Sequence, residues 1–330
     1  LSETVLVLYA ELLDQARSAD VPAELIADGS FVQKTIGEHR YWYRQKVDAG
    51  EKRQIYLGLD TPELLARIAG ARQQSANVRA DLNRRRELVS MLVAGGAAVE
   101  APAFTTVLKV LADALIFRRG GVLVGTQAFT CYANMLGVRF EAQSVRTADI
   151  DVAYHSRLSV GMSESAPIDL PEELKKADPK FVAVPELDAR HPSTSFKVRG
   201  RDLRVDFLTP MRGRETKPIS IPHLGVAAQP LAGLDYLIER TAQAVVVGGT
   251  GILVNVPAPA RYALHKIWVA HTRGVAEHAK SRKDLHQAEQ LLDVLLRDRP
   301  GDVDEATTAM TARPKMWKRV KPELTRITDK

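Results

Sequence analysis

Apolar positions near the N-terminus change their spacing once, and the two spacings predict two different elements. Residues 1–27 carry apolar side chains at helical intervals, which predicts an amphipathic helix. Residues 30–58 alternate instead and are rich in aromatic and β-branched types, with a polar turn at Asp48–Lys52. That second pattern predicts a small antiparallel hairpin or sheet.

A long helix is expected next. Thr61 has the side chain of an N-cap, and Pro62 suits the first helical turn. The helical pattern continues toward Val93, with Gly70 as a candidate break. The pair Gly95-Gly96 is expected to end the helix, because glycine disfavours its continuation.

Beyond residue 100, short apolar runs of strand length alternate with helical patterns. This mixture predicts an α+β fold, with a mixed-sheet core and helical N- and C-terminal parts. We expect three domains, over residues 1–100, 101–256 and 257–330. The expected elements are helices over 105–117, 127–136, 171–177, 259–271 and 280–296, strands over 121–124, 149–153 and 203–208, a turn at Gly125-Thr126, a hairpin over 244–256, and a basic tail after Pro300.

Three aspartates are the strongest candidates for chemistry. Asp149 and Asp151 are two positions apart in a predicted strand, so their side chains point to the same face. Two carboxylates so placed repel each other unless a cation lies between them, and Mg²⁺ accepts carboxylate oxygens together with substrate phosphates. Asp206 lies among apolar residues in a second predicted strand. Together the three could form a two-metal site for phosphoryl transfer.

A predicted strand, turn and helix precede these aspartates. Gly125 lets backbone amides approach a phosphate, and the Thr126 hydroxyl and the helix N-terminus add donors. Arg146 and Thr147, just before the paired aspartates, could contact phosphate or set the strand. Asp-x-Asp and Gly-Thr pairs also occur by chance, so spacing alone is equally consistent with a structural role.

Taken in order, the runs Val124–Thr126, Arg146–Asp151 and Val205–Phe207 resemble the DNA polymerase beta superfamily of nucleotidyltransferases. The Arg-Thr-x-Asp-Ile-Asp form is similar to bacterial minimal nucleotidyltransferases, including the nucleotidyltransferase toxins of type IV toxin–antitoxin systems. Further motifs resemble a bacterial family of nucleotidyltransferase fold proteins, namely Tyr41–Tyr43, Tyr56–Gly58, Pro259–Lys266 and Lys280–Leu285. With these included, the resemblance covers most of residues 30–296.

The resemblance implies transfer of a nucleoside monophosphate from a nucleoside triphosphate, with Mg²⁺ or Mn²⁺ as cofactor. The acceptor stays open between RNA, another nucleotide, a small molecule and a protein side chain. This chain departs from the superfamily at Thr126, where Ser or Gly is commoner. It also departs in the length of residues 127–148, which separate the Gly125-Thr126 turn from the paired aspartates and form a longer segment than in several superfamily members. The implied catalytic residues and metal ligands are Asp149, Asp151 and Asp206, and the implied nucleotide-binding residues are Gly125, Thr126, Arg146, Thr147 and Lys266.

Competing interpretations exist outside the aspartates. Lys266 could be an exposed helix lysine, and Asp284 could form a helix ion pair with Lys280. The bases and aromatics of His39–Arg44, followed by further bases at Lys46, Lys52 and Arg53, suit nucleic-acid binding, and packing on the N-terminal helices explains them equally well. The alternative to an enzyme is therefore a nucleotide- or nucleic-acid-binding module, or a toxin–antitoxin component that acts through a partner protein.

The composition of the chain bears on its partners and on its location in the cell. The net charge of +6 on 330 residues weakly favours a phosphate-bearing partner. The single Cys131 excludes an intrachain disulfide and fits a reducing cytoplasm. Residues 1–17 lack the basic start of a signal peptide, and no apolar run reaches the ~20 residues that cross a bilayer. A cytoplasmic protein without a membrane partner is expected, and its oligomeric state cannot be read from the sequence.

Overall fold

The computed structural model describes residues 1–18, 30–36, 39–48, 51–141, 148–155, 168–186 and 192–329. Its helices are α1 (Glu3–Ser18), α3 (Pro62–Ala94), α4 (Pro102–Asp113), α5 (Gly125–Leu136), α6 (Leu170–Ala177), α7 (Leu234–Ile238), α8 (Pro259–Ala270), α9 (His278–Asp298), α10 (Pro300–Thr311) and α11 (Pro314–Thr328). Its strands are β1 (Ser30–Ile36), β2 (His39–Asp48), β3 (Glu51–Leu59), β4 (Val122–Val124), β5 (Asp149–Ala153), β6 (Phe181–Ala183), β7 (Ser195–Val198), β8 (Arg204–Pro210), β9 (Ile219–Ile221), β10 (Val226–Leu231), β11 (Thr241–Val246) and β12 (Ile252–Pro257).

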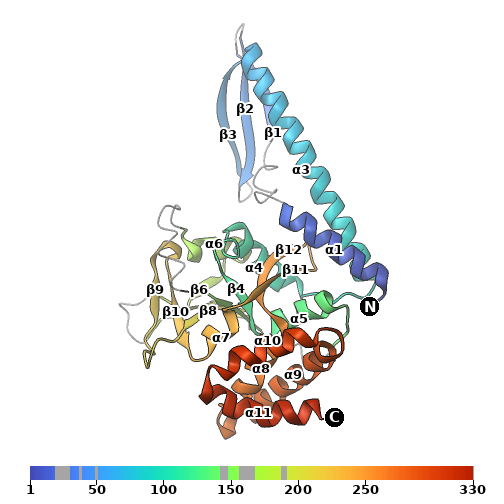
Figure 1. Ribbon diagram of the computed structural model, residues 1–330. Coiled ribbons are helices and arrows are strands. Elements are labelled where there is room, and N and C mark those ends of the chain that lie inside the picture. The colour runs from blue at the N-terminus through green and yellow to red at the C-terminus, as the bar shows by residue number, and fades with distance from the viewer. Residues whose placement is uncertain are drawn as a thin grey trace.

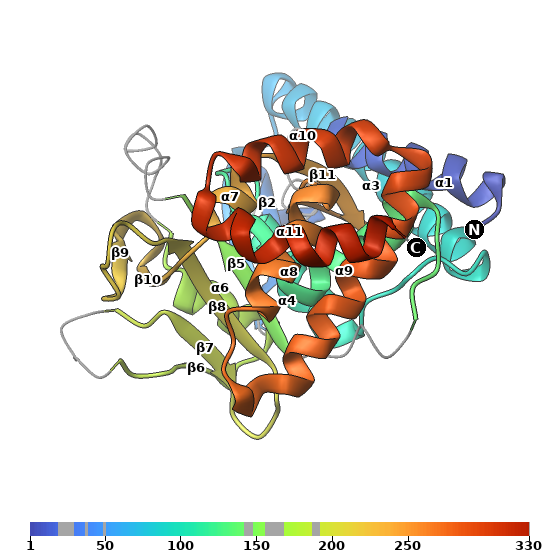
Figure 2. The same ribbon diagram turned by 60° about the horizontal axis from the view of Figure 1, so that its bottom comes forward.

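A mixed sheet forms the centre of the body. Its strand order is β4-β5-β8-β10-β9, and β7 pairs with both β8 and β6. Strands β5 and β8 run parallel, whereas β4 pairs antiparallel with β5. Helices α8 to α11 gather on one side of the body, and α1 and α3 lie at its other end (Figures 1 and 2). The predicted α+β fold with helical terminal parts is confirmed.

Four strands of this sheet were not predicted. Strands β6, β7 and β9 have only three or four residues, and β10 has six and contains Pro230. Runs this short give no clear period of two, so pairing partners rather than local pattern define them. Part of the weakly patterned stretch 155–200 lies outside the described residues.

The chain after Pro300 differs from the prediction of a basic tail. Pro300 and Pro314 each begin a helix, α10 and α11, at a position where proline costs no hydrogen bond. Apolar residues recur along α11 at intervals of three and four and pack into the main core, while its bases lie on the opposite face. The buried face of α11 consists of Met316, Val320, Leu324 and Ile327.

The N-terminal sheet β1-β2-β3 and helix α3 project together from the body (Figure 1). The predicted antiparallel pairing and the Thr61 N-cap are confirmed, since the Thr61 hydroxyl accepts a hydrogen bond from the Leu64 amide at 3.3 Å. The expected break at Gly70 is wrong, because α3 runs unbroken over 33 residues to Ala94. One glycine costs only about 1 kcal/mol in a helix interior, which the rest of a long helix offsets.

A second hydrophobic cluster joins α1 and α3 to the hairpin β11–β12. Leu12 is fully buried in this cluster, and the Tyr9 hydroxyl accepts a hydrogen bond from the Val245 amide at 3.0 Å. The Arg85 guanidinium donates to the carbonyl oxygens of Thr250 and Gly251 at the hairpin turn. These contacts fasten the projecting part to the body. The three predicted domain boundaries stay a prediction.

None of the helices in the described ranges combines the length and apolar character of a membrane-spanning segment.

Replacing Leu12 by Ala should loosen the contact between α1 and the body. Truncating a fully buried leucine costs about 2–5 kcal/mol, through lost burial and the cavity left behind. Val7 lies on the same helix but is 63% exposed, so Val7→Ala should change the free energy of unfolding by less than about 0.5 kcal/mol. Urea unfolding of both variants measures the difference, and equal losses would contradict this packing.

Candidate active site

The register of three strands brings the predicted aspartates together. Asp149 and Asp151 both lie on β5, two positions apart and therefore on one face of the sheet. Asp206 lies on the parallel strand β8, directly opposite Asp151. Val124, the last residue of β4, pairs with Asp151 from the other side. The three predicted aspartates therefore lie close together on two neighbouring strands, β5 and β8.

Burial and neighbouring negative charge raise the pKa values of two carboxyl groups at this site. Burial, with Asp206 and then Asp149 adding like charge, raises the pKa of Asp151 to about 6. Burial and Asp206 also raise the pKa of Asp149 above its usual range. Carboxylates that resist ionisation in each other's presence are a typical environment for a bound cation.

Arg204 and Asp206 form an ion pair that the sequence analysis missed. The Arg204 Nε atom donates to Asp206 Oδ1 at 2.8 Å and to Ser195 Oγ at 2.6 Å. Arg204 precedes Asp206 by two positions on one strand, so the rule that pairs Asp149 with Asp151 could have found it.

The donor set fits a hard divalent cation in its chemistry, because Mg²⁺ and Mn²⁺ prefer carboxylate oxygens. Within the described parts of the chain, no group of three or more His, Cys, Asp or Glu side chains already converges as a complete metal site. Asp206 is held instead by Arg204. A cation that used all three carboxylates would have to bind the second oxygen of Asp206 or displace the guanidinium from Oδ1.

Helix α5 begins beside Asp151, and its first residue must be glycine. Gly125 has a φ of +67°, and a Cβ atom there would lie 2.5 Å from Asp151 Oδ2. Both the backbone conformation and the close carboxylate therefore exclude a side chain. The predicted separate turn at Gly125-Thr126 is wrong in detail, because these residues already form the first turn of α5. The helix N-terminus points its free amides into the site region.

A buried tyrosine fixes this first turn. The Tyr262 hydroxyl donates to the Gly125 carbonyl oxygen at 2.9 Å and lies 3.2 Å from Gln287 Oε1. Tyr262 and Gln287 are almost fully buried on α8 and α9. The Tyr132 ring packs edge-on against Tyr262, with ring centroids 5.1 Å apart. The position of Gly125 is thus set by the C-terminal helices as well as by the sheet.

Cationic side chains from α8, α9 and the segment between them form the opposite wall. Lys266 Nζ lies 2.7 Å from Asp284 Oδ1, and Arg273 binds the other oxygen of Asp284. Asp284 is only 3% exposed, so it holds both cations in place. The competing interpretations are both wrong: Lys266 is largely buried, and Asp284 pairs with Lys266 and Arg273, while Lys280 lies 3.6 Å from Glu277.

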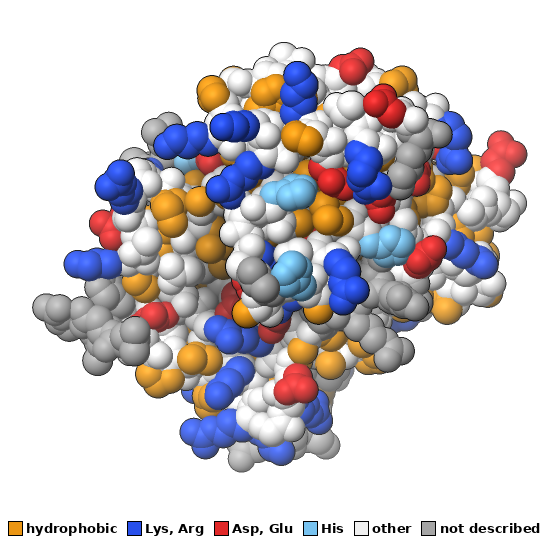
Figure 3. All heavy atoms as spheres, turned by 90° about the horizontal axis from the view of Figure 1, so that it is seen from below, with side chains coloured by type: hydrophobic (Ala, Val, Ile, Leu, Met, Phe, Trp, Pro, Cys, Tyr) orange, Lys and Arg blue, Asp and Glu red, His pale blue; other side chains and the backbone are white. Residues whose placement is uncertain are grey.

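Lys283 connects the two walls. Its Nζ donates to the Thr126 hydroxyl at 3.2 Å, and burial together with the neighbouring Lys266 lowers the pKa of Lys283. An open cavity of about 550 Å³ lies between the walls. On the face seen from below, acidic side chains are visible in a recess with Lys, Arg and His side chains on part of its rim (Figure 3). The cavity is lined by Gly125, Thr126, Asp149, Asp151, Lys266, Arg273, Lys280, Lys283 and Asp284.

Most predicted nucleotide-binding residues therefore lie in one place. Gly125, Thr126 and Lys266 line the cavity with two of the three aspartates, and Asp206 lies next to them on β8. Arg146 and Thr147 fall outside the described residues. Arg273 and Gln287 carry no local sequence signal, because their roles arise from the packing of α8 against α9.

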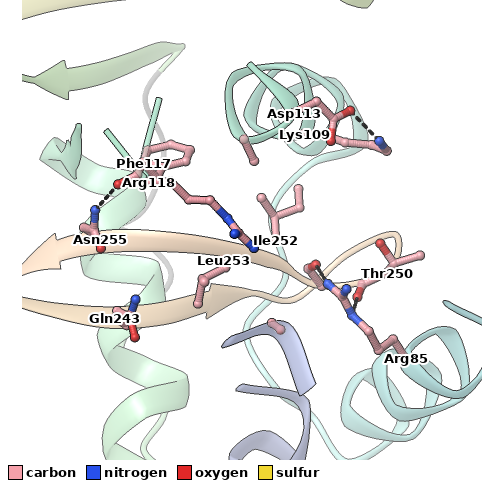
Figure 4. A pocket seen from close by; sticks show the side chains of 13 residues that line it. Arg85, Lys109, Asp113, Phe117, Arg118, Gln243, Thr250, Ile252, Leu253 and Asn255 are labelled. Carbon is pink, nitrogen blue, oxygen red and sulfur yellow. Dashed lines mark hydrogen bonds and ion pairs between the residues drawn. The ribbon is translucent and has the colours of Figure 1, made fainter. Parts of the chain in front are cut away.

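A second cavity lies at the joint between the projecting part and the body, among α1, α3, α4 and the hairpin β11–β12 (Figure 4). Its charged groups already have protein partners. Lys109 pairs with Asp113 at 2.6 Å, and Arg85 donates to backbone carbonyls of the hairpin turn. It has no pair of neighbouring carboxylates among its lining residues, so it lacks the chemistry of the first cavity.

Replacing Asp151 by Asn should stabilise the metal-free protein at neutral pH. The pKa of Asp151 is raised in the folded state, so the stability it contributes is present below pH 3.8 and is lost as the pH rises through about 6. A pKa of about 6 in place of 3.8 corresponds to a loss of roughly 3 kcal/mol at pH 7, which the neutral amide avoids. Urea unfolding in a chelating buffer should show this gain at pH 7 and little of it at pH 4. An equal effect at both pH values would contradict the raised pKa of Asp151.

Comparison with known proteins identifies the family. A family model described as Nucleotidyltransferase matches residues 103–311, which is more than half of the chain. No curated protein and no solved structure matches the chain. The matched region begins at α4 and ends at α10, and it contains the aspartates, the start of α5 and the cationic residues of α8 and α9. The chain therefore belongs to a nucleotidyltransferase family.

Proposed function

We propose that this protein transfers a nucleoside monophosphate from a nucleoside triphosphate to an acceptor hydroxyl, with Mg²⁺ or Mn²⁺ as cofactor and pyrophosphate as the leaving product. One observation carries the proposal: the same cavity has an acidic wall on β5 and a cationic wall on α8 and α9. A ligand that satisfies both walls must present cations to the first and anions to the second. A metal-bound triphosphate has this charge pattern.

Asp149, Asp151 and Asp206 would hold the divalent cation. Burial and mutual repulsion raise the pKa values of Asp149 and Asp151, and a bound cation would favour their ionised forms. When bound, the cation would lower the pKa of the acceptor hydroxyl and offset the charge on the transferred phosphoryl group. Release of Asp206 from Arg204 would leave that guanidinium next to the site as a further positive group.

The residues of the cationic wall would hold the triphosphate. Lys266 and Lys283 supply ammonium groups, and Arg273 supplies a guanidinium that can bind two phosphate oxygens at once. Asp284 positions Lys266 and Arg273 before the substrate arrives, which lowers the entropy lost on binding. The Thr126 hydroxyl and the N-terminal amides of α5 lie between the walls, where the phosphates would cross.

The reaction itself forms one bond and breaks one. The acceptor oxygen forms a bond to the α-phosphorus as the bond to the β-phosphate oxygen breaks, and pyrophosphate carries away the displaced charge. The acceptor proton passes to a base, for which Asp149 is the exposed carboxylate at the site. Positioning and charge stabilisation therefore account for what the protein contributes.

Substitution of either strand aspartate should abolish transfer. Incubation with each α-labelled nucleoside triphosphate, Mg²⁺ and total cellular RNA and protein should label an acceptor. Asp149→Asn and Asp151→Asn should each reduce label by roughly a hundredfold or more, the scale seen when one electrostatic group of a catalytic set is lost. Asp304→Asn changes an exposed aspartate on α10 and serves as the control. Label that survives in both site variants would refute the assignment of these carboxylates.

Removal of one phosphate-binding cation should weaken triphosphate binding. Lys283→Met should raise the KM for the nucleoside triphosphate roughly tenfold, because a hydrogen bond between charged groups contributes about 1.5–3 kcal/mol. Lys175→Met removes an exposed lysine on α6 and should leave the KM unchanged. A Lys283→Met variant with the parental KM would place the phosphates elsewhere.

A further inference from the structure

The face of the sheet that carries the aspartates continues beyond β8 onto β7. Asp149 pairs with Arg204 across β5 and β8, and Arg204 pairs with Lys197 across β8 and β7. Residues that pair directly across a ladder lie on one face, so these three side chains form a row on the face of the aspartates. In the adjacent row, Asp206 pairs with Ser195 on β7. The acidic site therefore has a basic border on β8 and β7.

The packing of the opposite face fixes the direction of Lys197. Phe196 and Val198, on either side of it in the strand, are buried in the main core, whereas Lys197 is exposed. The Phe196 ring packs edge-on against Phe207 of β8, with ring centroids 6.0 Å apart. Neighbouring strands lie about 4.8 Å apart, so the Cα atom of Lys197 is roughly 10 Å from that of Asp149. One small ligand can therefore contact both residues.

The guanidinium of Arg204 is held through one of its three nitrogens. Its hydrogen bonds to Asp206 and Ser195, among the residues that the structure describes, both use Nε. The two terminal nitrogens of a guanidinium can donate to two oxygens of one phosphate. Asp206 and Ser195 thus orient Arg204 without using the part of the side chain that binds phosphate best.

The acidic site separates this basic border from the cavity. The described lining of the cavity includes Asp149 and Asp151 of β5 and residues of α5, α8, α9 and the segment between the last two, but none of β7 or β8. Burial and Asp206 raise the pKa of Asp149, and Arg204 on β8 and Lys280 on α9 counteract that rise. Positive groups from inside and outside the cavity lining thus act on the same carboxylate.

The two sides of the site have different occupants in the proposed transfer, on which this inference rests. The displacement is in line, so the acceptor hydroxyl approaches the α-phosphate opposite the departing pyrophosphate. The cavity side would hold the triphosphate, with its leaving end against Lys266, Arg273 and Lys283. The acceptor would then approach over β8 and β7.

Charge on the acceptor side favours an anion. Residues 195–204 contain four Lys and Arg residues against one acidic residue, Asp202. Arg201 pairs with Asp178 at 3.4 Å, which makes it the least available of the four. A neutral acceptor would not need cations beside Asp149, whereas a phosphate would be bound by them. The four bases are all exposed, namely Lys197, Arg199, Arg201 and Arg204.

We propose that Lys197 and Arg204 bind a phosphate group of the acceptor, so that the acceptor of the transfer is a phosphorylated molecule. Its hydroxyl would lie at Asp149, roughly one or two strand spacings from that phosphate. The hydroxyl oxygen forms the bond to the α-phosphorus, the bond from the α-phosphorus to the β-phosphate oxygen breaks, and the hydroxyl proton passes to Asp149. The phosphate belongs either to a nucleic-acid strand or to a single nucleotide.

Fluorescence anisotropy tests the phosphate site without any transfer. The full chain is first saturated with Mg²⁺ and a triphosphate analogue that cannot release pyrophosphate, which occupies the cavity. Two labelled probes are then titrated separately: a single-stranded RNA of about ten nucleotides, within the range that one binding fold covers, and a nucleoside monophosphate. We expect at least one probe to bind, and unlabelled nucleoside without phosphate to compete at least tenfold more weakly than its monophosphate. The probe that binds identifies the source of the phosphate.

Substitutions at Lys197 locate the binding. Lys197→Gln should weaken it roughly tenfold, whereas Lys197→Arg should stay within about twofold, because only the first loses a charged hydrogen bond. If the strand is the ligand, Lys197→Gln should also lower the dependence of log K on log salt by about 0.7, the value for one phosphate contact. Lys315→Gln removes an exposed lysine from the first turn of α11 and is the charge-matched control.

Steady-state kinetics separate the acceptor side from the triphosphate side. With a labelled acceptor identified, Lys197→Gln should raise the KM for that acceptor roughly tenfold and leave the KM for the triphosphate unchanged, which is the reverse of the result expected for Lys283→Met. A role for Lys197 in folding alone would not raise one KM and spare the other.

Failure of this inference is distinct from failure of the proposed transfer. Binding that depends on Lys197, without any transfer product, would refute the transferase and retain the phosphate site. Three results would overturn the phosphate site and leave the transferase intact: neither probe binds, Lys197→Gln binds both probes like the parent, or the acceptor carries no phosphate. Urea unfolding checks that each variant keeps the parental stability.

Discussion

The parallel pairing of β5 with β8 is the constraint on which the rest of this structure depends. This pairing sets Asp206 on β8 beside Asp151 on β5. Asp149 lies two positions before Asp151 on the same strand, so negative charge is concentrated in one part of the sheet. Such a cluster costs folding free energy unless something opposite offsets it. Lys266 on α8 and Arg204 on β8 supply part of the offset, because both favour the ionised form of Asp151.

The cationic wall depends in turn on a buried network. Asp284 is almost fully enclosed and could not be tolerated as an unpaired charge, so Lys266 and Arg273 must remain with it. Tyr262 then ties α8 to the Gly125 carbonyl, which connects the cationic wall to the first turn of α5. Tyr262 and Lys283 therefore connect the cationic wall to the start of α5, beside the acidic wall.

Local sequence rules predicted the acidic wall but not its partner. The period of two placed Asp149 and Asp151 on one face, and the apolar residues around Asp206 predicted the strand on which it lies. Which residue lies opposite Asp151 depends on the register between β5 and β8, and a local pattern does not determine register. The network of Lys266, Asp284 and Arg273 forms only when α8 and α9 pack together, so it has no local signal either. The basic tail was misjudged because its many Lys and Arg residues obscured an apolar spacing of three and four residues along α11. The expected helix break at Gly70 was wrong for another reason. A single glycine is a local signal, and the helix of 33 residues that contains it continues through that position.

The central claim is that one triphosphate and its cation bridge the two walls, and a crystal structure with Mn²⁺ and a nucleoside triphosphate analogue that cannot release pyrophosphate tests it most directly. The account predicts an anomalous Mn²⁺ peak bonded to oxygens of Asp149 and Asp151, with phosphate oxygens within hydrogen-bond distance of Lys283 or Lys266. A triphosphate bound in the other cavity, beside Arg85, or a cation bound away from the aspartates, would contradict it.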